Sequence, residues 1–312
     1  MSRADAKADV GASLDHVYGD MEAADGLLGT GLTAANAAIT ALEARVTALE
    51  NAEPPPDPPD PPPASAFTSF PVVGACTSNV GANQGVATDG SRFWTTALDD
   101  ASLTIRRYDA AWAMEQGRST ATDAPAEKTQ VNGIVYEGGS LYIGANNWAS
   151  GRDRGWILEY DPDTLALIAE HDVGQDVTGG KSVEGCAFRN GEAWVFFNDS
   201  QYVARYSAGF ATFLGAYDVI ATPVDAGKIH NGGFWSGGVL YLNHHDNSSV
   251  DSVDAFAWDG SAFSHAGRIP QPTDGGTRCA QGMSIHGSLI YWAQRKRGGD
   301  GNKHSVVWTG ME

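Results

Sequence analysis

The stretch Asn132-Gly133-Ile134-Val135-Tyr136-Glu137-Gly138-Gly139-Ser140-Leu141-Tyr142 decides the fold. Residues with high strand propensity fill both halves of it, and the Gly-Gly pair between them suits the positive φ of a tight turn. The stretch therefore predicts a β-hairpin. An amide side chain precedes its first glycine, and an aromatic ring follows that glycine by nine residues.

The same pattern occurs four more times along the chain. The five copies begin at Gln84-Gly85, Asn132-Gly133, Glu184-Gly185, Asn231-Gly232 and Gln281-Gly282. Their glycines are 48, 52, 47 and 50 residues apart. A period of about 50 residues built from short strands and hairpins is typical of propeller blades. We therefore expect an all-β fold, a five-bladed β-propeller with four-stranded blades; the alternative is a strand-rich sandwich whose spacing is coincidental.

The last repeat stops after its third strand, at residues 305–309. Residues 66–73 precede the first repeat by the same offset that separates the other fourth strands from the repeats that follow them. We therefore expect this N-terminal strand to complete the fifth blade. Such a closure removes an exposed strand edge and joins the first blade to the last.

Composition limits the classes of function. The 312 residues are 42% hydrophobic and 19% charged, with a formal net charge of -18. An acidic protein repels phosphate backbones, so we expect no nucleic-acid partner. The chain has no 18-residue apolar run and its first residues lack the apolar core of a signal peptide, so we expect no membrane insertion. The three cysteines have no disulfide-framework or zinc-site spacing.

The segment before the propeller has helical periodicity. Apolar residues with alternating spacings of four and three stand at Leu28, Leu32, Ala35, Ile39, Leu42, Val46 and Leu49. Three heptads are marginal as an isolated helix, so partner helices are needed. The alternative is a helix packed on its own chain, but residues 54–63 read PPPDPPDPPP and predict an extended rod that separates the two. We therefore expect four parts: 1–27, a coiled coil over 28–53, a proline-rich linker over 54–63 and the propeller over 64–312.

The number of strands in the coiled coil is less clear. β-branched residues at a and leucine at d favour a dimer. However, residues 45–50, Arg-Val-Thr-Ala-Leu-Glu, resemble the trimerisation motif of short coiled coils. The resemblance implies that Arg45 packs over the seam and pairs with Glu50 of a neighbouring chain. We expect a homotrimer, with the contact residues Leu32, Ile39, Leu42, Arg45, Val46, Leu49 and Glu50.

The lengths of the connections between strands predict which face of the propeller carries the functional site. One face receives only tight turns, whereas the other receives long loops, where binding residues usually lie. Aromatic, amide and basic side chains in these loops suit a glycan, because rings stack on sugars while amides and guanidinium groups bond hydroxyls. The expected glycan-binding residues are Asn146, Asn147, Trp148, Arg152, Arg154, His244, His245, Asp246, Arg295 and Arg297. An axial polar ring is expected at Gln84, Asn132, Glu184, Asn231 and Gln281.

Each of these groups has a plainer explanation. The ring side chains can serve only to bond backbone groups where the inner strands begin. His244 and His245 could bind a metal with His230 or Asp246, but adjacent strand residues point to opposite sides. We therefore expect no metal and no cofactor.

The order of segments resembles that of bacteriophage tail-fibre and receptor-binding proteins, although no β-helical shaft is present. The resemblance implies a virion-attached fibre, assembled in the host cytoplasm, whose N-terminal residues 1–27 dock on a tail or capsid protein and whose head binds a host cell-surface glycan. Trimerisation would strengthen weak sugar binding through avidity.

Two alternatives remain for the function. One is a purely structural decoration of the virion capsid, collar or tail. The other is a glycan-degrading hydrolase of the five-bladed propeller class, which needs two carboxylates across the sugar bond. The inner strands offer one acid, Glu184, while Asp99, Asp199 and Asp246 lie farther out. The sequence accordingly favours a binding protein that is not an enzyme.

Overall fold

A computed structural model describes residues 40, 67–76, 80, 84–99, 102–120, 128, 130–147, 154–174, 182–197, 202–219, 229–245, 252–272, 278–295 and 304–312. The chain divides into two units, Met1–Pro59 and Asp60–Glu312. In the first unit only Thr40 is described, and it is helical and exposed. The predicted coiled coil and proline-rich linker, including all the expected trimer contacts, thus lie outside the described residues.

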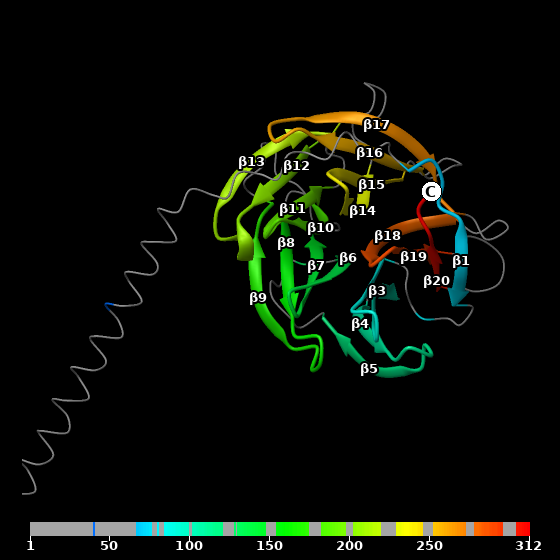
Figure 1. Ribbon diagram of the computed structural model, residues 1–312. Helices are drawn as coiled ribbons and strands as arrows, with labels where there is room; N and C mark the ends of the chain where they lie inside the picture. Colours follow the sequence, from blue (N-terminus) through cyan, green and yellow to red (C-terminus); the bar gives the residue numbers. More distant parts are fainter. Residues whose placement is uncertain are drawn as a thin grey trace, which may run out of the picture. The chain divides into compact units, whose positions relative to one another are not determined.

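Five four-stranded antiparallel sheets form the second unit, arranged as blades around one axis (Figure 1). Blade 1 contains β2 (Gly85–Thr88), β3 (Phe93–Asp99), β4 (Ser102–Tyr108) and β5 (Met114–Ser119). Blade 2 contains β6 (Gln130–Glu137), β7 (Ser140–Asn146), β8 (Gly155–Tyr160) and β9 (Leu167–Asp172). Blade 3 contains β10 (Val183–Arg189), β11 (Glu192–Phe197), β12 (Tyr202–Tyr206) and β13 (Phe213–Asp218), with the short 3-10 helix η1 (Ala208–Phe210) before β13.

Blade 4 contains β14 (Ile229–Ser236), β15 (Val239–His245), β16 (Ser252–Trp258) and β17 (Phe263–Pro270). Blade 5 contains β18 (Arg278–His286), β19 (Leu289–Arg295), β20 (His304–Thr309) and β1 (Val72–Cys76). The five-bladed propeller predicted from the repeat is therefore confirmed. Strands β6, β10, β14 and β18 lie near the axis, whereas β5, β9, β13, β17 and β1 form the rim (Figure 1).

The predicted closing strand is present but displaced along the sequence. β1 pairs with β20 from Val72 opposite Thr309 to Cys76 opposite Val306. The prediction of a strand over 66–73 was therefore wrong in its bounds. Pro71 has no amide hydrogen for a ladder, and residues 67–71 instead run along the C-terminus. The Thr68 amide donates to the Glu312 carbonyl at 2.5 Å, and the Gly310 amide donates to the Pro71 carbonyl at 2.9 Å.

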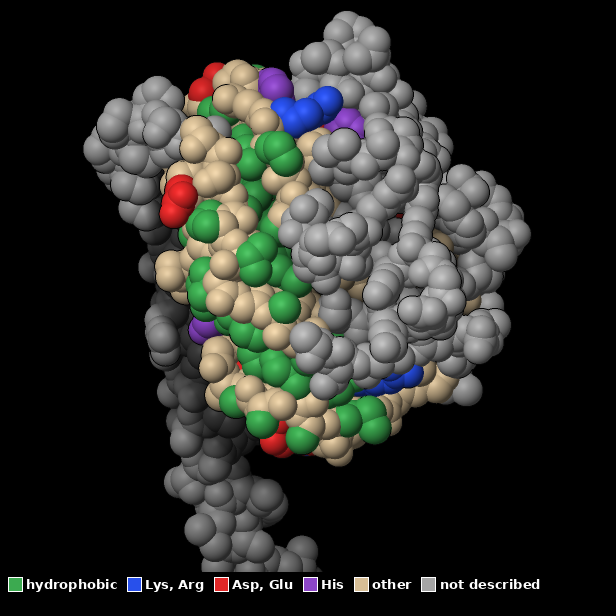
Figure 2. Space-filling view, turned by 90° about the vertical axis from the view of Figure 1, so that its right-hand side faces the viewer, with side chains coloured by type: hydrophobic (Ala, Val, Ile, Leu, Met, Phe, Trp, Pro, Cys, Tyr) green, Lys and Arg blue, Asp and Glu red, His purple; other side chains and the backbone are tan. Residues whose placement is uncertain are grey.

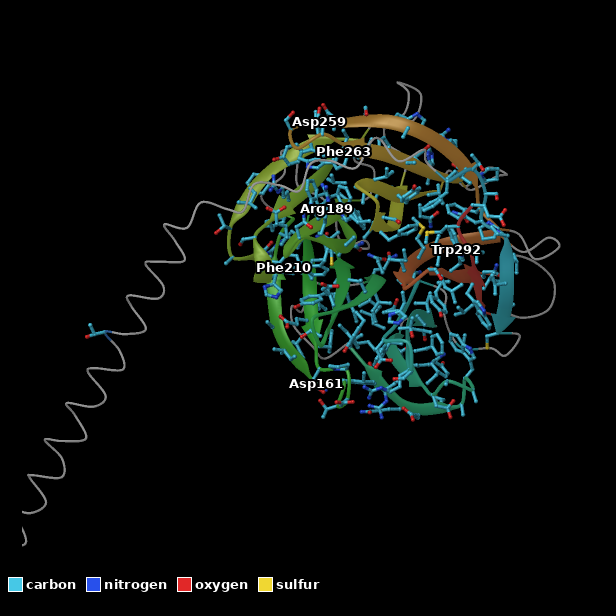
Figure 3. All side chains as sticks on the ribbon, viewed as in Figure 1. Asp161, Arg189, Phe210, Asp259, Phe263 and Trp292 are labelled. Atoms are coloured by element: carbon cyan, nitrogen blue, oxygen red, sulfur yellow. The ribbon has the colours of Figure 1, made fainter. Side chains whose placement is uncertain are left out.

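Buried side chains form five clusters, one at each interface between neighbouring blades. The clusters are represented by Trp156 between blades 1 and 2, Phe197 between 2 and 3, Phe256 between 3 and 4, Trp292 between 4 and 5, and Tyr108 between 5 and 1. Figure 3 labels Trp292 in blade 5, whereas Asp161 and Asp259 mark turns near the rim. Burial of large apolar surfaces at every interface makes the ring a rigid support for its loops.

The outer wall carries some apolar side chains. On β1, Val72 and Val73 are 50% and 62% exposed, and hydrophobic side chains are scattered over the face viewed in Figure 2. Single exposed apolar residues are ordinary on protein surfaces. Among the described residues, no helix has both the length and the apolar character needed to cross a membrane.

Candidate functional site at the axial mouth

The axial site begins with the dipeptides that start the innermost strands. Gln84, Asn132 and Glu184 are all buried there, at 5%, 1% and 2% exposure. Asn231 and Gln281 occupy the matching positions of β14 and β18, but their side chains lie outside the described set. Three of the five expected ring side chains are therefore described and buried, whereas only the backbone is described for the other two, and the ring itself stays a prediction.

The glycines after three of the ring residues allow the innermost strands to approach closely. A Cβ on Gly232 would lie 2.8 Å from the Met283 amide nitrogen, and a Cβ on Gly85 would lie 2.8 Å from the Ile134 amide nitrogen. At Gly282 a Cβ would overlap the Gln84 carbonyl oxygen. Real Cβ atoms do not approach backbone atoms so closely, so these glycines are required by close packing.

Asn132 ties three blades together. The Thr96 hydroxyl of blade 1 donates to the Asn132 carbonyl at 2.5 Å, and Nδ2 of Asn132 donates to the Val183 carbonyl of blade 3 at 2.9 Å. Within blade 2, Nε2 of Gln130 donates to Oδ1 of Asn132 at 2.6 Å. Asn132 therefore has the backbone-bonding role that we considered as the plainer explanation of the ring.

Glu184 differs from the other ring residues because it is an acid. Nδ2 of Asn146 donates to Oε1 of Glu184 at 3.2 Å, and the same nitrogen lies 3.4 Å from the Val183 carbonyl oxygen. Asn146 is fully buried at the end of β7, so its amide has a fixed position. The arrangement orients the Glu184 carboxyl at the end of the propeller where the long loops are attached.

Asn147 and Arg154 close the base of one long loop. The Arg154 amide donates to Oδ1 of Asn147 at 3.0 Å, and the Asn147 amide donates to the Arg154 carbonyl at 3.4 Å. The Arg154 guanidinium also bonds Asp172 at 3.0 Å and lies 5.1 Å from the Trp156 ring centroid. Both residues therefore contribute to contacts between described groups at this end of blade 2, rather than showing what they bind.

His244 belongs to a charged network in blade 4. Its Nδ1 lies 2.7 Å from Oδ2 of Asp254, and Arg268 donates to both oxygens of that carboxylate at 2.7 and 2.9 Å. Nε2 of His265 lies 3.3 Å from Oδ1. His244 and Asp254 are 3% and 1% exposed, whereas the Arg268 side chain is 38% exposed.

Burial raises the pKa of the Asp254 carboxyl, but this effect is outweighed by hydrogen bonds from His244 and Arg268 and by the charge of Arg268. The pKa of Asp254 is held well below its ordinary value of 3.8. Asp254 is therefore ionised at neutral pH, and the network around it has a fixed geometry.

Sequence reasoning missed three residues of this end of the propeller. Asp254 and Arg268 were not predicted, although an aspartate inside the apolar strand β16 was a visible signal. Lys128 was also missed; it is buried, and its Nζ donates to the Thr120 carbonyl at 2.6 Å. The signal for Lys128 is weak, because an isolated lysine in a long connection is usually solvated.

The remaining expected site residues cannot be located. Trp148, Arg152, Asp246 and Arg297 lie outside the described residues, and so do the side chains of His245 and Arg295. Their role in glycan binding remains a prediction. Within the described part of the chain, no group of three or more His, Cys, Asp or Glu side chains could hold a metal ion.

The fold defines the class of this protein: a five-bladed, all-β propeller, with buried polar side chains at the start of three of its innermost strands. No family model and no curated protein matches the sequence. Solved structures share the fold. A Myxococcus xanthus glutaminyl cyclase has a TM-score of 0.53 at 12% identity, covering 79% of this chain and 99% of its own.

Two carbohydrate-active enzymes have similar scores. A GH43 endo-arabinanase from Bacillus licheniformis has a TM-score of 0.54 at 11% identity, covering 78% of this chain and 96% of its own. An exo-β-1,3-galactanase from Phanerochaete chrysosporium has a TM-score of 0.50 at 10% identity, covering 75% of this chain and 64% of its own. At such identities the likeness concerns the fold alone.

These comparisons contradict one expectation from the sequence. We expected a protein that is not an enzyme, because the inner strands offer one acid. The three solved propellers named above are enzymes, so the fold gives no ground for excluding catalysis. The solved structures named here include no phage fibre or receptor-binding protein. The resemblance to such proteins rests on the order of segments alone.

Proposed function

We propose that the propeller is a glycan-degrading hydrolase whose proton-transferring carboxyl belongs to Glu184. The observation that carries the proposal is the position of this acid. Glu184 stands buried at the start of the innermost strand of blade 3, and Asn146 orients it. Glycoside hydrolysis requires such a carboxyl to protonate the leaving oxygen.

The surrounding amides suit a saccharide. Gln84 lies at the same level of blade 1, and its amide group can both donate to and accept from hydroxyls, whereas the amide of Asn132 bonds the Val183 carbonyl and Gln130. A hydrolase also needs a second carboxylate, either as the base that activates water or as the nucleophile. The long loops offer Asp199 and Asp246 by sequence. The arabinanase and galactanase with the same fold support this choice of substrate class.

The test is release of reducing ends from polysaccharides by the full-length chain. Arabinan and β-1,3-galactan are suitable first substrates, followed by bacterial surface polysaccharides. We expect hydrolysis by the wild type and a loss of at least about 100-fold in Glu184→Gln, because an amide cannot act as a general acid. Glu159→Gln is the matched control, since Glu159 bonds Ser140 and His171 within blade 2. Equal rates in Glu184→Gln and the wild type would contradict the proposal.

One observation favours a second candidate. Among the described ring side chains, Glu184 is the single carboxylate, and some reactions need one proton-transfer group rather than two. Cyclisation of an N-terminal glutamine is one of them, and it is the activity for which the Myxococcus xanthus structure is named. The amine attacks the side-chain carboxamide, the C–N bond to ammonia breaks, and one acid can relay the proton.

The two candidates differ in substrate but share Glu184. Incubation of the full chain with a peptide that begins with glutamine, followed by mass spectrometry, detects loss of ammonia. Ammonia loss that disappears in Glu184→Gln, together with no release of reducing ends, would replace the hydrolase by the cyclase. Loss of neither activity upon mutation would remove Glu184 from both.

The segments before the propeller support a finer proposal. The seam at 28–53 and the proline-rich stretch at 54–63 suit a trimeric stalk on a virion, with three heads that meet a host glycan. Antibodies against the full chain should then label virus particles in negative-stain images. Labelling of host material without particles would contradict this part of the proposal.

A further inference from the structure

At the face of the tight turns, a turn of blade 2 reaches across to blade 1. Nε1 of Trp94 donates to the Pro162 carbonyl at 3.1 Å. Arg107 stands opposite Trp94 in the register of β3 and β4. Its guanidinium donates to the Pro162 carbonyl at 3.4 Å and also to the Asp163 carbonyl. Arg92 pairs with the Asp163 carboxylate. The turn between β8 and β9 thus supplies blade 1 with carbonyl oxygens and one acidic side chain.

The interface between blades 3 and 4 repeats the donors of this arrangement. Trp194 of β11 stands opposite Arg205 of β12, just as Trp94 stands opposite Arg107 in blade 1. The neighbouring blade contributes an aromatic ring in both cases. In blade 4 it is Trp235, whose ring centroid lies 5.2 Å from that of Trp194. The two interfaces are therefore built to the same plan on the donor side.

The acceptors differ, because the turn of blade 4 is shorter. Six residues, 161–166, join β8 to β9, whereas four residues, 259–262, join β16 to β17. Trp194 is 1% exposed, and its Nε1 has no hydrogen-bond partner within the described part of the chain. The same holds for Nε1 of Trp235. An indole N–H only donates, and a ring face accepts more weakly than a carbonyl oxygen. Two buried donors therefore lack the oxygen that Trp94 has.

Arg189 adds a positive charge to this interface. Its guanidinium lies 4.8 Å from the ring centroid of Trp235. Glu192, its cross-strand partner in β10 and β11, pairs with Arg205 instead, with Oε2 2.8 Å from Nε of Arg205. Among the residues that the structure describes, Arg189 has no ion pair. Figure 3 labels Arg189 and Phe263 in the part of the ring where blades 3 and 4 meet.

We propose that the interface between blades 3 and 4, at the face of the tight turns, binds an acidic turn of a partner protein. The turn of blade 2 on blade 1 indicates the chemistry that fits. Main-chain carbonyl oxygens would accept from the indoles of Trp194 and Trp235, and an aspartate side chain would pair with Arg189. This site is separate from the proposed catalytic acid, because β10 begins near Glu184 and ends at Arg189.

Phe263 covers part of the proposed site. Its half-buried ring has its centroid 5.6 Å from that of Trp194 and 5.8 Å from that of Trp235. Phe263 is the first residue of β17, directly after the short turn, where blade 2 has the smaller Leu167. Binding of a partner turn therefore requires the Phe263 ring to swing outward. A smaller side chain at this position should favour the binding-competent arrangement.

The probe is a cyclised peptide with residues 160–167 of this chain, Tyr-Asp-Pro-Asp-Thr-Leu-Ala-Leu, which reproduces the turn of blade 2. It is titrated to millimolar concentration into the full-length chain labelled with ¹⁵N at tryptophan, and the indole signals are followed by NMR. We expect the signals of Trp194 and Trp235, assigned with Trp194→Phe and Trp235→Phe, to move downfield. The Trp292 signal should stay in place, because its Nε1 already donates to Thr309 at 2.9 Å.

Variants test the charge and the covering ring. Arg189→Gln should weaken peptide binding at least about tenfold, because a hydrogen bond between charged groups is lost. Phe263→Ala should strengthen it at least about tenfold, because the ring no longer has to move. Arg118→Gln, on the rim strand β5 of blade 1, is the matched control and should bind like the wild type.

The proposal is overturned if neither indole signal moves in the wild type and in Phe263→Ala. It is also overturned if Arg189→Gln binds the peptide as tightly as the wild type, or if Arg118→Gln loses as much affinity as Arg189→Gln. These outcomes are independent of hydrolysis and cyclisation, because no variant in this series changes Glu184.

Discussion

Gly282 illustrates how single residues determine the packing at the axial mouth. A methyl group at this position would meet the carbonyl oxygen of Gln84 and lie 2.8 Å from Cα of Gly85. Both atoms belong to the backbone of a neighbouring blade and cannot turn away. The glycine of the repeated dipeptide is therefore a requirement of blade packing rather than of turn formation.

We predict that Gly282→Ala lowers the free energy of unfolding by about 1–3 kcal/mol, the usual cost of overpacking. Urea denaturation of the full chain measures this change. Gly117→Ala is the control, because its new Cβ would meet only Cγ of Arg106 at an ordinary 3.9 Å. An equal loss in both variants would show that the mouth is not tightly packed.

Asp254 gives a prediction about pH. Its pKa is lower in the folded protein than in the unfolded chain, so the unfolded chain binds the proton first as pH falls. The stabilisation from this carboxylate is complete above about pH 5 and is lost progressively below that. We expect the melting temperature of the wild type to fall in this range more steeply than that of Asp254→Asn.

At neutral pH, Asp254→Asn should destabilise the protein by about 3 kcal/mol, the low end for breaking a buried pair, because Arg268 keeps contact with water. Asp172→Asn, which breaks the more exposed pair with Arg154, should cost less than about 1 kcal/mol. Similar costs for the two substitutions would contradict the special role of the blade 4 network.

Site residues could be predicted from the sequence where they belong to the repeated dipeptide at the start of each inner strand, and not where they lie away from it. Glu184 was found because it precedes a repeated glycine. The hydrogen bond from Asn146 to Glu184 was not predicted, and neither was the contact between His244 and Asp254, because each joins two different strands. Such contacts depend on register, and a one-residue shift would turn each side chain to the other face.

At the scale of elements, the strands could largely be predicted. The hairpin at the start of blade 2 was expected within residues 132–142, where β6 and β7 meet, because strand propensity and the Gly-Gly turn mark it clearly. The closing strand was misplaced because its position depends on pairing with β20 across the whole sequence. Local propensity cannot supply that information, and a proline within the segment changes which residues pair.

The N-terminal segment that completes blade 5 also gives a prediction about the free energy of unfolding. Phe70 is 6% exposed and packs on Trp292, with ring centroids 5.2 Å apart. Phe70→Ala should therefore lower the free energy of unfolding by about 3 kcal/mol, measured by urea denaturation. Val73→Ala, nearby but exposed, should change it by less than about 0.5 kcal/mol. A negligible effect of Phe70→Ala would mean that this segment does not seal the ring.

At the scale of the whole molecule, the proposed trimeric stalk can be tested through the mass of the assembly. Multi-angle light scattering of the full chain should give three times the mass of one chain. Leu42→Asp places a charge in the predicted seam and should yield monomers, whereas Glu43→Gln should leave the trimer intact. A wild-type dimer or monomer would contradict the trimer.

The most direct measurement of the central claim is a crystal structure of full-length Glu184→Gln with an oligosaccharide that the wild type cleaves, beginning with arabino- and β-1,3-galacto-oligosaccharides. We expect the sugar to lie across the axial mouth, with its glycosidic oxygen within hydrogen-bonding distance of the residue 184 amide. A sugar bound on the outer wall, or at the face of the tight turns, would contradict the assignment of the working site.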